Sequence, residues 1–363
     1  MRLLDRQVWI ELSEPFFFGV AAFTSIFFAG SQLQKLTNYM LKGLSLLTAT
    51  ELVILVLPGI IVLTLPMATL LAILQGFGRL SSDSEIVALY SSGVSLRRIA
   101  VPVIILGLLV SIASFVLNEA VVPAANRLYD GLVADVLKEP LKSKQALSFV
   151  ETDGEVTTQV LVFGGINVRD GIMRDVAVTQ YRKNKPFVMF TAKKAVRDEK
   201  SDNKWTLHDG WLKYLQPQMK ADIKFSDLET QEIKIHRPAE EIALEGLEPE
   251  NMSAGQLTSL IRAKKPIGAD TSRLEVGLYN KFSLQLASLV FAMIGLPLGI
   301  RPHRSGSGYG MGLSVVVILA YWLVWHYMTA LANQGSLPPM VGAFTADILG
   351  ICGAAALLAR VAK

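Results

Sequence analysis

Six long apolar stretches, three on each side of a polar insert, constrain this chain more than any other feature of its sequence. They lie at residues 15–33, 52–77, 99–122, 282–300, 310–332 and 340–359. Each is close to the roughly 20 residues that an α-helix needs to cross the hydrocarbon core of a bilayer. The sequence therefore predicts a polytopic α-helical membrane protein with six transmembrane helices. We expect three domains: residues 1–123 and 271–363 in the membrane, and residues 124–270 inserted between helices 3 and 4.

The composition agrees with a membrane protein. Hydrophobic residues make up 51% of the chain and charged residues 18%, whereas soluble proteins contain about 25% charged residues. The net charge is +4, but Lys and Arg are spread along the chain without a basic tract. We therefore expect no nucleic-acid partner.

The Lys and Arg residues of the short loops indicate how the chain crosses the membrane. With a cytoplasmic amino terminus, only Lys35 and Lys42 lie in short segments on the outside. Nine residues then lie inside: Arg2, Arg6, Arg79, Arg97, Arg98, Arg301, Arg304, Arg360 and Lys363. We expect both termini in the cytoplasm and the insert on the outer side.

The insert has the pattern of a β domain between two helices. Residues 124–138 predict an amphipathic helix, and residues 145–235 form short alternating segments separated by turn-like groups. Because no helical crossovers intervene, this pattern favours an antiparallel sandwich or jelly roll. Ser253 and Gln256 then form a capping-box pattern that opens a short helix.

The sequence contains no recognisable catalytic or cofactor motif. The glycine-rich residues 305–312 lack the lysine and the spacing of a phosphate-binding loop. The histidines are scattered, at His208, His236, His303 and His326. We expect no metal, no cofactor and no enzymatic activity in this chain.

A short helix, about residues 82–92, is predicted between the second and third spans on the inner side. Ser82 can cap its first turn while Glu85 reaches back, and Gly93 can end it. Such a helix could be gripped by a peripheral motor, or it could be a capped connector. Periodicity alone does not distinguish the two.

Several strings of the sequence resemble the lipopolysaccharide-export permeases of the LptF/LptG (YjgP/YjgQ) family. They are GRLSSDSEIVALYSSGVSLRRI, LNEAVVPAANR and GLPLGIRP, followed by GYGMGL, YW and LPP. The resemblance implies a permease subunit of an ATP-driven exporter that extracts lipopolysaccharide, or a related glycolipid, from the outer leaflet of the bacterial inner membrane. It also implies that the insert is a periplasmic β-jellyroll.

The resemblance implies partners as well. They are a cytoplasmic ABC-type ATPase dimer that uses the ATP, a second permease subunit (in a homodimer or as a paralogue) and periplasmic jellyroll bridge proteins. Glu85 matches the acidic residue of the family's ATPase-coupling helix. We expect the coupling residues to be Ser82, Asp83, Glu85, Leu89 and Arg97.

Two groups of residues are candidates for lipid contact. Lys35 and Lys42 resemble the basic positions that family members direct at the anionic head group, although lysines at helix ends also snorkel to the interface. In the fifth span, Tyr321 and Trp325 could cover acyl chains.

Intramembrane ionisable residues usually pair, and His326 and Asp347 fall at nearly the same depth. We predict a hydrogen bond between them, with a structural role or a role as a proton relay.

Two other classes of function stay open at this point. An ion-coupled secondary transporter would have broken helices with charged residues near the midplane, and Pro58, Pro66 and Pro297 could break helices. A membrane-anchored envelope assembly factor would use the outer β domain to bind proteins.

Overall fold

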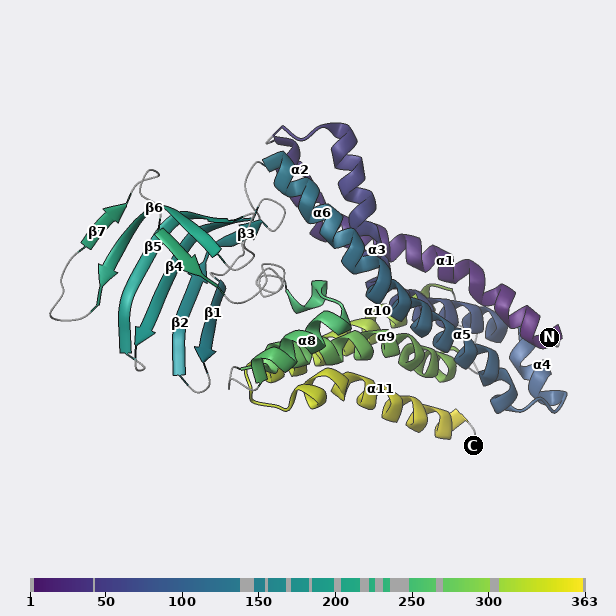
Figure 1. Ribbon diagram of the computed structural model, residues 1–363. Coiled ribbons are helices and arrows are strands. Elements are labelled where there is room, and N and C mark those ends of the chain that lie inside the picture. Colours follow the sequence, from purple (N-terminus) through teal and green to yellow (C-terminus); the bar gives the residue numbers. More distant parts are fainter. Residues whose placement is uncertain are drawn as a thin grey trace. The chain divides into compact units, whose positions relative to one another are not determined.

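The computed structural model describes residues 3–41, 43–137, 147–153, 156–167, 171–182, 185–198, 204–215, 222–225, 231–235, 248–265, 270–300 and 307–361 (Figure 1). The chain divides into two compact units. One comprises Met1–Tyr129 with Thr271–Lys363, and the other comprises Asp130–Asp270.

Six helices among the described residues are long and apolar enough to span a membrane. They are α1 (Leu3–Ser31), α3 (Leu46–Ser82), α5 (Leu96–Val116) with its continuation, α9 (Ser272–Gly299), α10 (Ser307–Asn333) and α11 (Pro339–Val361). Two short helices lie between the first spans, α2 (Leu33–Leu41) and α4 (Glu85–Ser91). The predicted arrangement of three spans, an insert and three spans is confirmed.

Helix α3 lies at the centre of the helical unit and packs closely against three other spans. A Cβ atom on Gly19 of α1 would lie 3.1 Å from the Ala68 Cα, and one on Gly310 of α10 would lie 3.1 Å from the Leu74 carbonyl oxygen. On α9, a Cβ on Gly295 would lie 3.0 Å from the Ile73 side chain. Small residues let helices approach this closely in a membrane, where packing drives association.

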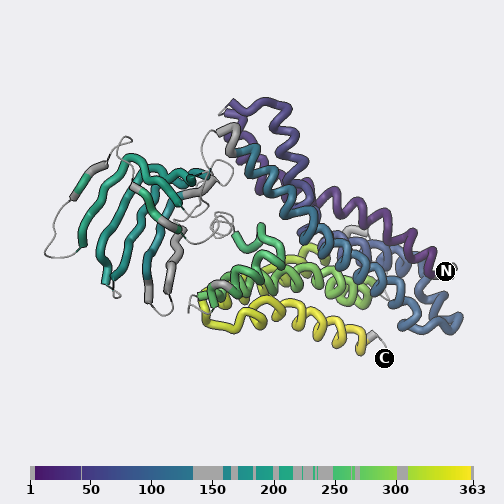
Figure 2. Tube along the Cα trace, viewed as in Figure 1, coloured from purple at the N-terminus to yellow at the C-terminus, as the bar shows by residue number. Residues whose placement is uncertain are grey.

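The third span continues beyond the predicted apolar stretch without a break (Figure 2). Helix α5 passes through one π-turn, η1 (Leu117–Val121), into α6 (Val122–Leu137), where the Val122 N–H donates to the Leu117 carbonyl. Pro123 explains the π-turn, because proline has no N–H and its ring clashes with the carbonyl four residues earlier. The predicted amphipathic helix is therefore the end of one long helix.

The described residues of the insert form one antiparallel sheet, followed by a short helix. Its strands are β1 (Leu147–Asp153), β2 (Val156–Phe163), β3 (Gly165–Asn167), β4 (Ile172–Arg182), β5 (Lys185–Arg197), β6 (Lys204–Tyr214), β7 (Asp222–Phe225) and β8 (Gln231–Lys234). The order is β1-β2-β4-β5-β6-β7, with β3 beside β4 and β8 beside β6. The predicted antiparallel β domain between helices 3 and 4 is confirmed. The sequence analysis did not single out β7, although its four residues alternate between polar and apolar side chains.

The sheet is strongly curved (Figure 1). In β4, β5 and β6 the buried positions normally alternate, but each strand has one gap of three residues: Met173 to Val176, Ala192 to Ala195 and Leu207 to Gly210. Asp175 and Asp209 lie in these gaps with φ of 51° and 53°. The register of the three strands continues through this row without a shift. Because the gaps fall at the same row of all three strands, the apolar side chains before and after it share the inward face. The inward face forms an apolar core around Trp205.

After the sheet, η2 (Pro249–Asn251) leads into α8 (Ala254–Lys264). The Ser253 side chain accepts from the Gln256 N–H, and the Gln256 side chain accepts from the Ser253 N–H. The predicted capping box is confirmed.

Candidate functional site

Helix α4 is held between the ends of α3 and α5 by two residues with positive φ. Ser84, with φ of 64°, separates α3 from α4, and Gly93, with φ of 80°, follows α4. The N–H groups of Gly93 and Val94 donate to the carbonyls of Tyr90 and Leu89, which closes the helix. Gly93 therefore ends α4 as predicted.

The predicted capping by Ser82 and Glu85 is wrong. Ser82 belongs to the last turn of α3, and its hydroxyl donates to the Arg79 carbonyl at 2.8 Å. Because the chain reverses at Ser84, Ser82 cannot reach the N–H groups of α4. The Glu85 side chain instead accepts a hydrogen bond from the Gln7 Nε2 of α1, at 3.0 Å.

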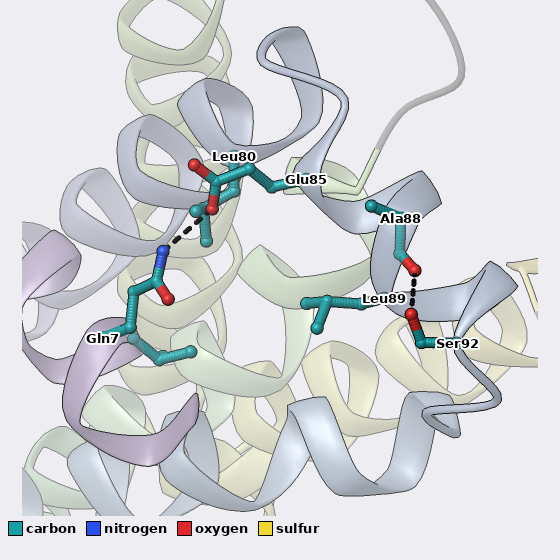
Figure 3. Close-up of a pocket in the computed structure, with 7 residues that line it drawn as sticks. Gln7, Leu80, Glu85, Ala88, Leu89 and Ser92 are labelled. Atoms are coloured by element: carbon teal, nitrogen blue, oxygen red, sulfur yellow. Dashed lines mark hydrogen bonds between the residues drawn. The ribbon is translucent and has the colours of Figure 1, made fainter. Parts of the chain in front are cut away.

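A pocket of about 240 Å³ lies between α4, α3 and the first turns of α1. Its lining residues are Gln7, Val8, Leu80, Glu85, Ala88, Leu89 and Ser92 (Figure 3). Aliphatic side chains form most of the wall, with the Glu85 carboxylate and the Gln7 amide at one side. The pocket can therefore receive a side chain that has an apolar stem and a polar or cationic end.

Ion pairs hold the surroundings of this pocket. Asp5 of α1 pairs with Arg98 of α5 at 2.7 Å, and Glu11 of α1 pairs with Arg79 of α3 at 3.3 Å. Below α4, Ile86 is 2% exposed and packs into an apolar cluster with Val8 and Leu12. The first turns of α1 therefore contact every helix that meets at α4.

The opposite side of α4 faces outward and is partly apolar. Val87 is 58% exposed and Tyr90 is 38% exposed. Partial burial raises the pKa of the Tyr90 phenol above its usual value. An exposed Val and Tyr beside a pocket are typical of a surface that binds another protein.

The five predicted coupling residues are placed differently from one another. Glu85 and Leu89 line the pocket, whereas Ser82 and Asp83 lie at the turn between α3 and α4. Arg97 is exposed in the first turn of α5, outside the pocket lining. The sequence analysis missed Gln7 and Val8. A signal existed in Asp5 and Glu11, two acidic residues at the start of an apolar span, which could pair with the arginines of the next inner loop.

Lys35 is exposed on α2, a short helix separated from α1 by a turn at Gln32. Lys42 lies outside the described residues. Lipid contact by these two lysines stays a prediction.

The structure differs from the prediction for the fifth and sixth spans. Asp347 is 1% exposed and accepts hydrogen bonds from the hydroxyl of Ser283 at 2.6 Å and that of Tyr321 at 2.9 Å. His326 is exposed and lies against the rings of Trp322 and Trp325. His326 is five residues after Tyr321, about 140° around the helix, so it cannot point at the same carboxylate. The predicted pairing of His326 with Asp347 is therefore corrected.

Tyr321 and Trp325 are also more buried than a lipid-covering role requires, at 7% and 6% exposure. Tyr321 packs edge-on against Phe291 of α9, with ring centroids 4.9 Å apart. The exposed face of α10 is formed by other side chains, including Val316, Leu319, Leu323 and Tyr327. In the described part of the chain, no group of three or more His, Cys, Asp or Glu side chains could hold a metal ion.

Comparisons with known proteins agree with this architecture. The family model described as "Lipopolysaccharide export system permease LptF/LptG" matches residues 6–360. The lipopolysaccharide export system permease protein LptG of Escherichia coli K12 is 21% identical over 291 residues, which cover 77% of this chain and 76% of that protein. LptG of Escherichia coli O6:H1 gives the same values. An uncharacterized protein of Rickettsia prowazekii is 23% identical over 198 residues, and the match spans 52% of either chain.

The cluster around Asp347 provides a test of the helical packing. The Tyr321→Phe variant removes one hydrogen bond from a buried carboxylate, so we expect the protein to lose about 0.5–2 kcal/mol of stability. The matched control is Tyr327→Phe, because Tyr327 lies on the same helix and is 63% exposed. Thermal unfolding in detergent measures both. Equal unfolding temperatures for the two variants would contradict the assigned hydrogen bond.

Proposed function

Because this chain belongs to the LptF/LptG family of lipopolysaccharide export permeases, we propose that it is the permease subunit of an ATP-driven exporter. It extracts lipopolysaccharide or a related glycolipid from the outer leaflet of the inner membrane and passes it to a periplasmic bridge. It does so with a separate cytoplasmic ATPase dimer that binds and hydrolyses the ATP. The observation that carries this proposal is the pocket beside α4, in a chain whose sequence has no catalytic motif.

The proposed orientation puts α4 in the cytoplasm and the β domain in the periplasm. The excess of Lys and Arg in the loops on one side supports it. The contacts of Asp5 with Arg98 and of Gln7 with Glu85 support it too. They keep the amino-terminal end of α1 beside α4, so the two lie on the same side of the membrane.

The proposed ATPase contact uses α4 as a small protruding helix. Glu85 is already held by a neutral amide, so a cationic side chain of the ATPase would form the stronger, charge-assisted bond with it. Val87 and Tyr90 add exposed apolar surface around this contact. Helix α4 has seven residues, which is long enough to enter a groove of the ATPase. Because short turns join it to α3 at one end and to α5 at the other, a displacement of α4 would also displace these two helices.

A second permease subunit completes the proposed complex, because an ATPase dimer has two grooves and each chain has one α4. The partner is a copy of this chain or a paralogue. Helices α1 and α10 are our candidates for this interface, because both expose large apolar side chains. Phe17 of α1 and Leu323 of α10 are 70% and 71% exposed. Lipid would enter sideways between the two subunits.

The sheet of the insert supports the proposed transfer to periplasmic jellyroll proteins. Among the described strands, β7 pairs only with β6, so its other edge offers N–H and C=O groups to a further strand. At this end of the sheet Ile223 is 50% exposed and lies opposite Leu212 on the inward face. An added strand would therefore extend an apolar surface along which acyl chains could pass.

An ion-coupled transporter is less well supported. Pro58 and Pro66 lie inside the continuous helix α3, and Pro297 lies inside α9, so none of them breaks a helix. The buried Asp347 is bound by two neutral hydroxyl groups. These contacts suit a carboxylate that fixes helices together.

The ATPase contact is tested by reversing the charge of Glu85. We expect Glu85→Arg to abolish co-purification of the ATPase, because a cation would repel the residue that Glu85 binds. Glu51→Arg is the control, since Glu51 is exposed at the other end of α3. Affinity purification from membranes, with the bound ATPase quantified, measures both. If the Glu85→Arg variant recovers as much ATPase as the unsubstituted protein, Glu85 does not contact the ATPase, and its role is the hydrogen bond with Gln7 alone.

The bridge contact is tested by crosslinking from the edge of the sheet. A photocrosslinking residue in place of Ile223 should capture a periplasmic β protein in intact cells. The same residue in place of Lys194, which is exposed on the central strand β5, should not. Capture with equal yield from both positions, or none from Ile223 in cells that export lipid, would argue against strand addition at β7.

A further inference from the structure

The first turns of α1 have more specific contacts than a membrane anchor needs. Three polar side chains spread around this segment reach three different helices: Asp5 contacts α5, Gln7 contacts α4 and Glu11 contacts α3. Between them, Val8 and Leu12 are 4% and 2% exposed. The segment is thus fitted into the junction at which α4 meets its neighbours (Figure 3).

Beyond this junction α1 packs along α3 on one side and exposes its other side. Gly19 approaches the Ala68 backbone, and the Thr24 hydroxyl is 3.1 Å from that of Thr64. The exposed Phe17, Phe18 and Ile26 lie away from the core. Helix α1 is therefore bound to α3 along one side, and its first turns alone contact α4 and α5 through polar bonds.

Helix α1 is also continuous from the junction to its far end. It runs unbroken from Leu3 to Ser31, about 43 Å at 1.5 Å per residue. The short helix α2, which carries Lys35, follows after one turn. A displacement of the first turns would therefore be transmitted along the helix to the opposite side of the membrane.

We propose that Asp5, Gln7 and Glu11 are positioning residues that make α1 move together with α4. This inference rests on the proposed function, in which the ATPase displaces α4. The two ion pairs and the amide–carboxylate bond transmit that displacement to α1, and α1 transmits it to the outer end of the first span. Without them the ATPase would still dock on α4, but its movement would reach α1 less efficiently.

The two ion pairs are partly buried, so the test replaces their carboxylates with amides of the same size. The Arg79 side chain is 63% exposed, but those of Arg98, Asp5 and Glu11 are 28%, 19% and 16% exposed. Asn and Gln keep the shape of the side chain and one hydrogen-bond acceptor for the arginine. Thermal unfolding of each variant then separates loss of coupling from loss of fold.

The test uses the complete complex in proteoliposomes, with ATP hydrolysis and lipopolysaccharide release measured together. For the double variant Asp5→Asn, Glu11→Gln we expect normal ATPase recovery and hydrolysis, and lipid released per ATP reduced by about fivefold or more, as for loss of coupling between two sites. The control is Glu14→Gln, because Glu14 is an exposed carboxylate on the same segment. Equal release per ATP for the double variant and the control would overturn the proposal.

A charge reversal tests one ion pair by itself. Exchanging the two charges, with Glu11→Arg and Arg79→Glu together, should restore lipid release relative to Glu11→Arg alone.

A second measurement does not depend on any ATPase. Spin labels in place of Phe18 and Val87, both exposed, report the distance between α1 and α4 in the purified chain. Cys352, the single cysteine of the sequence, is exposed and is first replaced by Ala so that it takes up no label. We expect one narrow distance distribution in this background and a broader one when Asp5→Asn and Glu11→Gln are added. Unchanged distributions would overturn the link between the helices. If the unsubstituted complex released lipid without ATP, the proposed function itself would fail, whatever the labels showed.

Discussion

Close packing around α3 is the constraint on which the helical unit depends. Lipid tails are as apolar as Leu or Ile side chains, so helices in a membrane associate through shape and small residues. Gly19, Gly295 and Gly310 bring three other spans against the α3 backbone. Because α3 continues to Ser82 and then turns into α4, the central helix of the bundle is also the one joined to the candidate ATPase contact.

Much of this fold could be predicted from the sequence because the relevant interactions are local. Length and hydropathy predict the six spans, and the Ser253–Gln256 capping box joins residues three apart. The bond between Gln7 and Glu85 joins residues 78 positions apart, and no local pattern predicts it. The partners of Asp347 depend on how three helices are rotated against one another. The depth of the residues in the membrane predicts His326 as the partner of Asp347, whereas the rotation of α10 about its axis directs Tyr321 at this carboxylate.

Two kinds of contact hold the helical unit together. Around Asp347, hydroxyl groups from α9 and α10 bind a carboxylate from α11, which fixes these three spans as one block. Helix α1 takes no part in this cluster. It packs along α3, and the polar side chains of its first turns bind α3, α4 and α5. In the proposed function, these bonds let α1 follow α4 when the partner ATPase displaces it.

The most direct test of this account is the energy source for lipid release. The purified complex is reconstituted in liposomes that contain lipopolysaccharide, and transfer to a soluble periplasmic acceptor is measured with ATP, with ADP and with an imposed proton or sodium gradient. The account predicts transfer with ATP alone, no transfer with ADP, and no dependence on either gradient. Transfer driven by a gradient without ATP, or by this chain without an ATPase, would contradict it.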